Sequence, residues 1–230
     1  LRRFVNAYQR VQPLTIGELW AVAITLRIML VENLRRATHR IVVGRQQRED
    51  ADVLADRLLA DKAPQRAAIE TVLKPYDKTP LTATFAAQLV QRLRYQDPAL
   101  TPAMLWLETK LNAQGTSTDI VVQSEHLRQS AMTVTVRNII TSMRHVSAVD
   151  WAELFETISP IDALLRCGSG FAQMDFATRD QYRRAIEELA RGSHLTELEV
   201  AARALSATTA AGRRAFVNEV EKKRACDPGY

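Results

Sequence analysis

Thr15-Ile16-Gly17-Glu18-Leu19-Trp20 begins the stretch of the chain that decides its fold. A threonine followed three residues later by a glutamate is a capping box. The Thr15 hydroxyl accepts the backbone N–H of Glu18, and the Glu18 carboxylate accepts that of Thr15. Apolar residues then recur at helical spacing on one wide face, namely Ile16, Leu19, Trp20, Ala23, Ile24, Leu30, Val31 and Leu34. The pattern predicts a helix that runs past residue 40 and can continue to residue 59. We expect this helix to be buried at the centre of its domain.

Arg27 falls in the middle of that apolar face. A buried guanidinium requires an acidic partner, and Glu32 or a carboxylate on another helix can supply it. We therefore predict a buried ion pair that fixes how helices cross. The functional alternative is an anion or sugar contact made by Arg27 and Glu32 together with Arg35 and Arg36.

Short helices separated by Pro turns are predicted in the middle of the chain, at residues 64–74, 82–95 and 101–112. Thr101 followed by Pro102 has the residue types of an N-cap and a first helical position. The next stretch, residues 118–146, is ambiguous because its residues 133–136 alternate like a strand. Six apolar residues share one helical face there, and they favour one long helix: Val121, Met132, Val136, Ile139, Met143 and Val146.

The last third of the chain also reads as helices, with Asp150 and the Thr196/Glu199 box as N-terminal caps and residues 167–170 as a loop. Within it, the stretch Met174-Asp175-Phe176-Ala177-Thr178-Arg179-Asp180-Gln181-Tyr182-Arg183 opens a helix that ends at Gly192. Thr178 is the predicted N-cap, with Gln181 as its box partner. The predicted buried stripe consists of Tyr182, Ala185, Ile186 and Leu189. Arg179 and Arg183 then lie outside it and can dock an acidic neighbour, although a simple packing helix is the alternative.

Composition supports an all-α protein. Only eight Gly and eight Pro occur in 230 residues, so long helix-forming stretches run uninterrupted. We predict a multi-helix bundle of long and short helices without a significant sheet. It would form a single domain over residues 1–230, with sub-lobes 1–115 and 116–230 as an option.

Charge and cysteine content point to no special partner. The net charge of +5 is spread along the chain, which is typical of a solvated helical surface, and no nucleic-acid-binding motif is present. Two cysteines, Cys167 and Cys226, predict free thiols. The apolar stretch 19–34 is shorter than the roughly 20 residues of a membrane span and contains charges, so no transmembrane segment is expected.

No catalytic, cofactor-binding or metal-binding constellation is predicted. Trp20, Trp106 and Trp151 lie on apolar helical patterns and favour core packing over sugar stacking. The four histidines occur singly, without the spacing of a metal helix: His39, His126, His145 and His194. The carboxylate pairs Asp175/Asp180 and Glu187/Glu188 are ordinary for helix starts and wet faces.

Several blocks of the chain resemble the large bacterial cyclic β-1,2-glucan synthases. They include Pro13-Leu14-Thr15-Ile16-Gly17-Glu18-Leu19-Trp20, Leu30-Val31-Glu32-Asn33-Leu34-Arg35-Arg36 and parts of residues 3–9, 134–144, 148–156 and 175–189. The blocks keep their order along nearly the whole chain, and the similarity is loose between residues 44 and 116. The start at Leu1 also predicts a piece of a longer protein.

The resemblance implies the region that precedes the membrane helices and the transferase domain of such a synthase. The full enzymes use UDP-glucose to build a β-1,2-glucan on a protein-attached primer, adjust its length by phosphorolysis and cyclise it. The Asp-x-Asp pair and the Gln-x-x-Arg-Trp box of their transferase domain are absent here, so no catalytic residue carries over and no cofactor is expected.

We therefore expect a non-catalytic cytoplasmic domain at the inner membrane that scaffolds or docks the UDP-glucose-dependent transferase part. Its partners would be the remainder of the synthase and the glucan chain. The alternative is a glucan- or nucleotide-binding regulatory module. A self-contained enzyme is a third reading, which the motif search disfavours.

Overall fold

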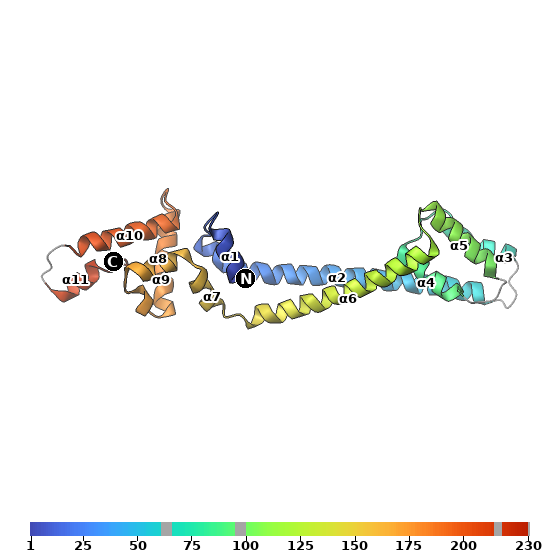
Figure 1. The fold of residues 1–230 in the computed structure, drawn as a ribbon, viewed down its shortest axis with the longest axis horizontal. Helices are drawn as coiled ribbons and strands as arrows, with labels where there is room; N and C mark the ends of the chain where they lie inside the picture. Colours follow the sequence, from blue (N-terminus) through green and yellow to red (C-terminus); the bar gives the residue numbers. More distant parts are fainter. Residues whose placement is uncertain (61–65, 95–99, 214–217, 230) are drawn as a thin grey trace. The chain divides into compact units, whose positions relative to one another are not determined.

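The computed structural model describes residues 1–60, 66–94, 100–213 and 218–229 (Figure 1). All regular elements of these residues are helices, which confirms the all-α class. The α-helices are α1 (Arg2–Gln9), α2 (Ile16–Leu59), α3 (Arg66–Leu73), α4 (Ala83–Leu93), α5 (Thr101–Ala113), α6 (Thr118–Ala148), α7 (Trp151–Ile158), α8 (Pro160–Gly168), α9 (Phe176–Arg191), α10 (Glu197–Ala211) and α11 (Glu219–Ala225). Two 3₁₀ helices accompany them, η1 (Lys74–Tyr76) and η3 (Gly170–Gln173).

Some predicted boundaries lie outside the described residues, namely a helix start at Pro64 and a helix end at residues 95–98. The ambiguous stretch 133–136 is helical within α6, and α2 reaches Leu59 as the longer prediction had it. None of the described helices combines the length and the apolarity needed to cross a membrane. Cys167 and Cys226 are exposed, free thiols.

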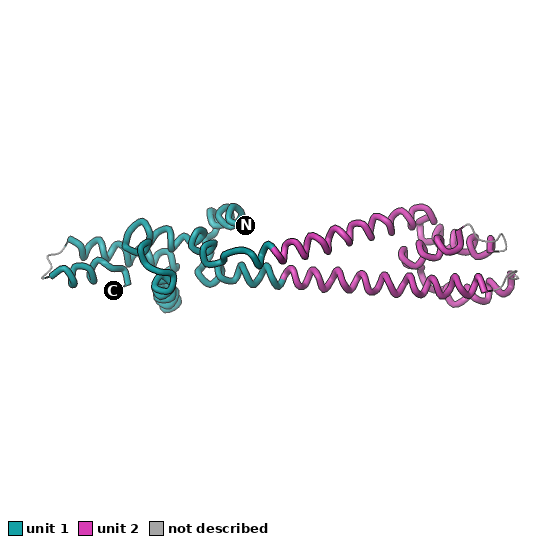
Figure 2. The backbone as a smooth tube through the Cα atoms, turned by 90° about the horizontal axis from the view of Figure 1, so that it is seen from below, with its two compact units in different colours: residues 1–28, 145–230 teal, residues 29–144 magenta. Residues whose placement is uncertain are grey.

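The chain divides into two compact units (Figure 2). Unit 1 comprises Leu1–Ile28 and His145–Tyr230, and unit 2 comprises Met29–Arg144. Each unit has its own hydrophobic core. The sub-lobes 1–115 and 116–230 divide the chain differently, because the two ends of the chain contribute to the same core in unit 1.

Unit 2 is built on an antiparallel pair formed by its parts of α2 and α6. Many of the buried or half-buried residues of α2 in unit 2 are spaced by three, four or seven residues, which is the heptad pattern of a coiled-coil seam. They are Leu30, Leu34, Ala37, Gly44, Arg48, Ala51, Ala55 and Leu58. The helices α3, α4 and α5 pack around the far end of this seam through Phe85, Leu89 and Leu107.

Only Ile16 and Leu19 of the predicted apolar face of α2 are fully buried, and Trp20, Ile24 and Val31 are exposed, so the prediction of a central buried helix is wrong. Ile24 and Ile28 in unit 1 are 58% and 60% exposed, and Met29 and Val31 in unit 2 are also exposed. The physical reason in unit 2 is that a pair of helices can cover only a narrow stripe of each member. The wide apolar face predicted from the sequence is therefore only partly covered by other helices.

The core of unit 1 is formed by α1, the start of α2 and helices α7 to α10. Trp20 stacks on Phe155 with ring centroids 4.4 Å apart and meets the edge of Phe176. Gly168 ends α8, so the predicted loop at 167–170 begins later than expected. A Cβ at Gly168 would lie 2.9 Å from the Leu205 side chain, so a larger residue there would require the leucine side chain or the helices to shift.

The predicted tryptophan packing holds in part. Trp106 and Trp151 are half-buried, and Trp106 packs against the core of unit 2. Their indole N–H groups donate to Asp77 and to the Val146 carbonyl, respectively.

The helix caps test the local predictions directly. The capping boxes Thr15/Glu18 and Thr196/Glu199 are confirmed, and Asp150 caps α7 as expected. Thr178 is not an N-cap, because α9 begins one turn earlier with Asp175 as its cap. Thr101 is the first residue of α5, whose N-cap is Leu100.

Candidate functional site

Arg183 lies at the centre of a buried ion-pair network in unit 1. Its side chain is 0% exposed and binds Asp162, itself fully buried, through two hydrogen bonds. The Nε atom donates to Oδ1 at 3.0 Å and Nη2 donates to Oδ2 at 2.6 Å. The prediction that Arg183 lies outside the buried stripe of α9 is therefore wrong. Leu189, predicted in that stripe, is 61% exposed.

Three aromatic rings surround the Arg183 guanidinium. Its central carbon lies 5.0 Å from the ring centroids of Phe155 and Phe176 and 5.9 Å from that of Phe171. The buried Nη1 atom makes no hydrogen bond among the described residues, and the ring faces supply cation–π attraction instead. Burial alone would lower the pKa of Arg183, but hydrogen bonds and charge from Asp162 and Glu156 raise it above its ordinary value.

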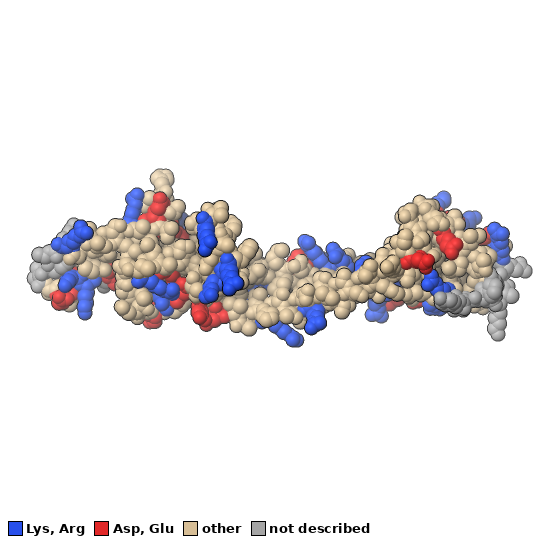
Figure 3. Space-filling model, in the orientation of Figure 1, with Lys and Arg blue, Asp and Glu red and all other residues tan. Residues whose placement is uncertain are grey.

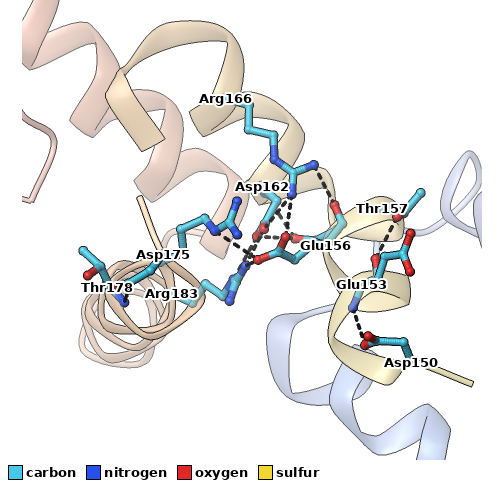
Figure 4. Close-up of polar contacts among 11 residues, drawn as sticks. Asp150, Glu153, Glu156, Thr157, Asp162, Arg166, Asp175, Thr178 and Arg183 are labelled. Carbon is cyan, nitrogen blue, oxygen red and sulfur yellow. Dashed lines mark hydrogen bonds and ion pairs between the residues drawn. The ribbon is translucent and has the colours of Figure 1, made fainter. Parts of the chain in front are cut away.

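Glu156 joins this network from α7. It accepts from Arg183 Nη2 at 2.9 Å and forms ion pairs with Arg179 at 3.0 Å and Arg166 at 3.1 Å. Figure 4 shows Arg166 and Arg183 approaching Glu156 and Asp162 from two sides. The network thus ties α7, α8 and α9 together. Arg179 is half-buried in it, so the arginines predicted to dock a partner are turned inward.

The residues predicted around Arg27 are not brought together into a site. Arg27 is exposed and makes no ion pair within the described chain, so the predicted buried pair is wrong. Glu32 instead accepts from Arg35 and Arg36, each at 2.7 Å, on the surface of α2. The hydrogen bonds from Arg35 and Arg36 lower the pKa of Glu32 to about 2. Exposed pairs of this kind contribute little to folding.

A second charged cluster lies in unit 2, and the sequence predictions missed it. Glu125 of α6 is only 3% exposed. Arg128 holds it with two hydrogen bonds, from Nε to Oε2 at 2.7 Å and from Nη2 to Oε1 at 2.9 Å. Thr84 of α4 donates to the same carboxylate at 3.1 Å, and Gln129 donates at 3.0 Å.

Arg48 of α2 approaches the same carboxylate more loosely, with Nη1 3.7 Å from Glu125 Oε1. Gly44 makes this crowding possible, because a Cβ there would lie 3.2 Å from Arg128 Nη2 and 3.7 Å from Arg48 Nη1. Burial raises the pKa of Glu125, but the hydrogen bonds from Arg128, Gln129 and Thr84 outweigh it and hold the pKa below its ordinary value. Glu125 therefore stays ionised at neutral pH.

This cluster forms one wall of a cavity of about 640 Å³. Ligand pockets in proteins commonly have roughly this volume, about 300–1,000 Å³. Helices α2, α4 and α6 of unit 2 line it with mostly polar side chains and with the apolar side chains of Ile41, Met132 and Val136. His126 is on the wall and pairs with Gln91 at 3.2 Å. Within the described ranges, no group of three or more His, Cys, Asp or Glu side chains could hold a metal ion.

A signal in the sequence could have located the Glu125 cluster. Glu125 and Arg128 are spaced i, i+3 on a predicted helix, and Gly44 and Arg48 continue the apolar heptad of α2 with residues that are not apolar. Polar residues at seam positions that are otherwise apolar indicate a polar contact between the two helices at that level. Asp162 and Arg183, by contrast, are 21 residues apart on different helices, and no local spacing connects them.

The described residues thus form an all-α segment of two helical units, each organised around an arginine–carboxylate cluster. Over 196 residues, the chain is 39% identical to the cyclic β-(1,2)-glucan synthase NdvB of Rhizobium meliloti (strain 1021). The match covers 85% of the chain and 7% of that much longer protein. The resemblance expected from the sequence blocks is confirmed. No family model matches the chain.

Proposed function

We propose that this chain is a non-catalytic helical segment of a cyclic β-1,2-glucan synthase that docks on the UDP-glucose-dependent transferase part of the same enzyme. The observation that carries the proposal is the 39% identity to NdvB over 85% of the chain. As part of such an enzyme, it would act at the cytoplasmic face of the bacterial inner membrane. The glucan chain would pass near it without being chemically altered.

Exposed apolar side chains on unit 2 support a docking role. Val31, Val42 and Val43 of α2 are exposed, as are Leu127 and Val134 of α6. Figure 3 shows uncharged surface along the middle of α2 and α6, with basic side chains projecting at its edges. Large apolar groups gathered on a helical surface favour protein–protein contact. A transferase domain of the same polypeptide is the partner that the similarity to a much longer synthase suggests.

The test is an association experiment between this chain and the transferase part of the synthase. Replacing Val42 and Leu127 together by Glu removes apolar contacts without disturbing the seam, since both side chains are more than half exposed. We expect the isolated variant to keep its circular dichroism and melting temperature but to lose co-purification with the transferase part. In the full synthase, the same variant would lose glucan output.

The matched control is Arg45→Glu, which changes charge on an exposed position of the same helix. This variant should still co-purify. Unaltered association and glucan output of the Val42→Glu/Leu127→Glu variant would contradict docking through this surface. Glucose transfer from UDP-glucose by the isolated chain, abolished by a substitution in the chain, would contradict its non-catalytic nature.

A second candidate function is ligand binding by the chain itself, as a nucleotide- or glucan-responsive module. The cavity of unit 2 favours this function, whereas Arg27, Glu32, Arg35 and Arg36 line no described cavity.

A further inference from the structure

We infer that the cavity of unit 2 binds a small molecule through a phosphate or diphosphate group, held by the guanidinium groups of Arg48 and Arg128. This inference rests on the second candidate function and specifies its ligand. The chemistry recognised is the anionic group, and the uncharged body of the ligand would contact the apolar side chains of the lining.

The charge of the cavity wall is the first argument. Its lining contains three arginines, Arg40, Arg48 and Arg128, and one carboxylate, Glu125, which gives a formal charge of 3 − 1 = +2 with His126 neutral. The single carboxylate is already committed, because it accepts hydrogen bonds from Arg128, Thr84 and Gln129. The surplus positive charge therefore has no counterion among the lining residues.

Unused hydrogen-bond donors are the second argument. Arg128 donates hydrogen bonds from Nε and Nη2 to Glu125 and Thr84, and its Nη1 makes no hydrogen bond within the described residues. Arg48 makes only the 3.7 Å approach to Glu125. A guanidinium carries five N–H donors in a planar fork that matches phosphate oxygens.

Preorganisation is the third argument. Gly44 leaves the surface of α2 bare, and two of the guanidinium groups, those of Arg48 and Arg128, lie within 4 Å of the position that a Cβ would take there. Two like charges held this close to one another repel unless an anion lies between or beside them. The single negative charge of Glu125 balances one of the two guanidinium charges from the buried side. A phosphate entering the cavity would balance the other from the solvent side.

The volume and the apolar lining residues of the cavity limit the size of the ligand. A volume of about 640 Å³ exceeds that of a phosphate ion and accommodates a small organic body. Ile41, Met132 and Val136 would contact that body. Many neutral hydrogen-bonding side chains of the wall are already paired, such as Gln88 with Asp52 and Gln91 with His126, which disfavours a purely neutral sugar.

The test uses the 230-residue chain and inorganic pyrophosphate as the probe, with isothermal titration calorimetry at low ionic strength. We expect saturable binding that weakens as salt is added, because the attraction is electrostatic. Arg48→Gln should weaken this binding about tenfold, since it removes a charge-assisted contact. The melting temperature of the free variant should not fall, because Arg48 makes no short contact in the folded chain and its charge is repelled by that of Arg128.

Arg45→Gln is the matched control, since Arg45 lies one turn of helix away and pairs with Glu49 on the surface. It should bind pyrophosphate like the unaltered chain. Equal weakening of pyrophosphate binding in both variants would show that the binding is only general electrostatic attraction to the surface, and it would overturn the inference. Binding of a neutral glucose oligomer that Arg48→Gln leaves unchanged, with no pyrophosphate binding, would overturn the phosphate assignment but keep the ligand-binding function. Absence of binding by either probe would overturn both, and docking on the transferase would be unaffected.

Discussion

Arg183 in unit 1 and Arg128 in unit 2 each hold a buried carboxylate with two hydrogen bonds, but their surroundings differ. Arg183 is fully buried among three phenyl rings, and its partner Asp162 comes from another helix. Arg128 is 42% exposed, and its partner Glu125 lies one turn away on the same helix. The first cluster fastens three helices to one another, whereas the second lines an open cavity with spare donors.

The contribution of an arginine–carboxylate pair to the free energy of unfolding depends on how accessible the pair is to water. A guanidinium that loses its partner in the interior remains desolvated, while one at a cavity wall can be hydrated. Unit 1 therefore uses its cluster for cohesion. Unit 2 depends less on its cluster for folding, which leaves spare donors available for a ligand.

The largest expected effect is that of Asp162→Ala. It leaves the Arg183 charge buried with only Glu156 as a partner, so unit 1 should lose about 3–5 kcal/mol of unfolding free energy. Urea denaturation followed by tryptophan fluorescence measures this in a Trp106→Phe background, where Trp20 and Trp151 both report on unit 1. Asp180→Ala, which removes a pair with the exposed Arg184, is the control and should cost at most about 0.5 kcal/mol. A loss below about 1 kcal/mol for Asp162→Ala would contradict the conclusion that the buried cluster of unit 1 contributes more to folding than the cluster of unit 2.

Glu125→Gln should have a smaller effect on unit 2. The neutral amide still accepts one hydrogen bond, and the freed Arg128 guanidinium can turn to water, so we expect a cost of about 1–2 kcal/mol. The measurement is urea denaturation monitored by Trp106, with Trp20 and Trp151 replaced by Phe. A cost equal to that of Asp162→Ala would mean that the two clusters are energetically alike.

The third prediction concerns Asp175, the N-cap of α9, and separates the effect of its charge from the effect of its capping hydrogen bond. The Thr178 backbone N–H and hydroxyl donate to Asp175, which lowers the pKa of this carboxyl. A lowered carboxyl pKa contributes stability that is present above the unfolded-state pKa of about 3.9 and is lost as pH falls through the folded-state value. Asp175→Asn keeps the cap and should remove this part of the acid sensitivity. Asp175→Ala should lower the urea midpoint at neutral pH as well.

Thr178→Ala is the control for the same helix start. It keeps the backbone N–H that Asp175 accepts, so its urea midpoint at neutral pH should lie closer to that of the unaltered chain than the midpoint of Asp175→Ala does. The opposite order would restore Thr178 as the functional cap.

The smallest expected effect is that of Arg27→Ala. Arg27 is exposed and lacks an ion pair within the described chain, so its truncation should change the unfolding free energy by less than about 0.5 kcal/mol. The Trp106→Phe background again reports on unit 1. A loss of several kcal/mol would show that Arg27 has a buried partner and belongs with Arg183.

Local signals in the sequence determined the helices of this protein. The capping boxes at Thr15 and Thr196 and the cap at Asp150 involve groups only three residues apart, so the sequence alone contains both partners. The similarity to NdvB is likewise a property of the sequence. The Glu125–Arg128 pair was within reach of the same reasoning, because its spacing is local.

Tertiary structure decided which helical faces are covered and where α9 begins. Asp175 and Thr178 are both good caps, and the helix starts at Phe176 because this ring packs against Trp20 and Arg183. Arg27 lies on an apolar face and is exposed, whereas Arg183 was expected outside the buried stripe and is completely buried. The physical reason is that the burial of a helical face depends on which other helix packs against it. For Arg183 that helix carries Asp162, 21 residues away in the sequence, and the periodicity of a single helix does not predict which helix packs there.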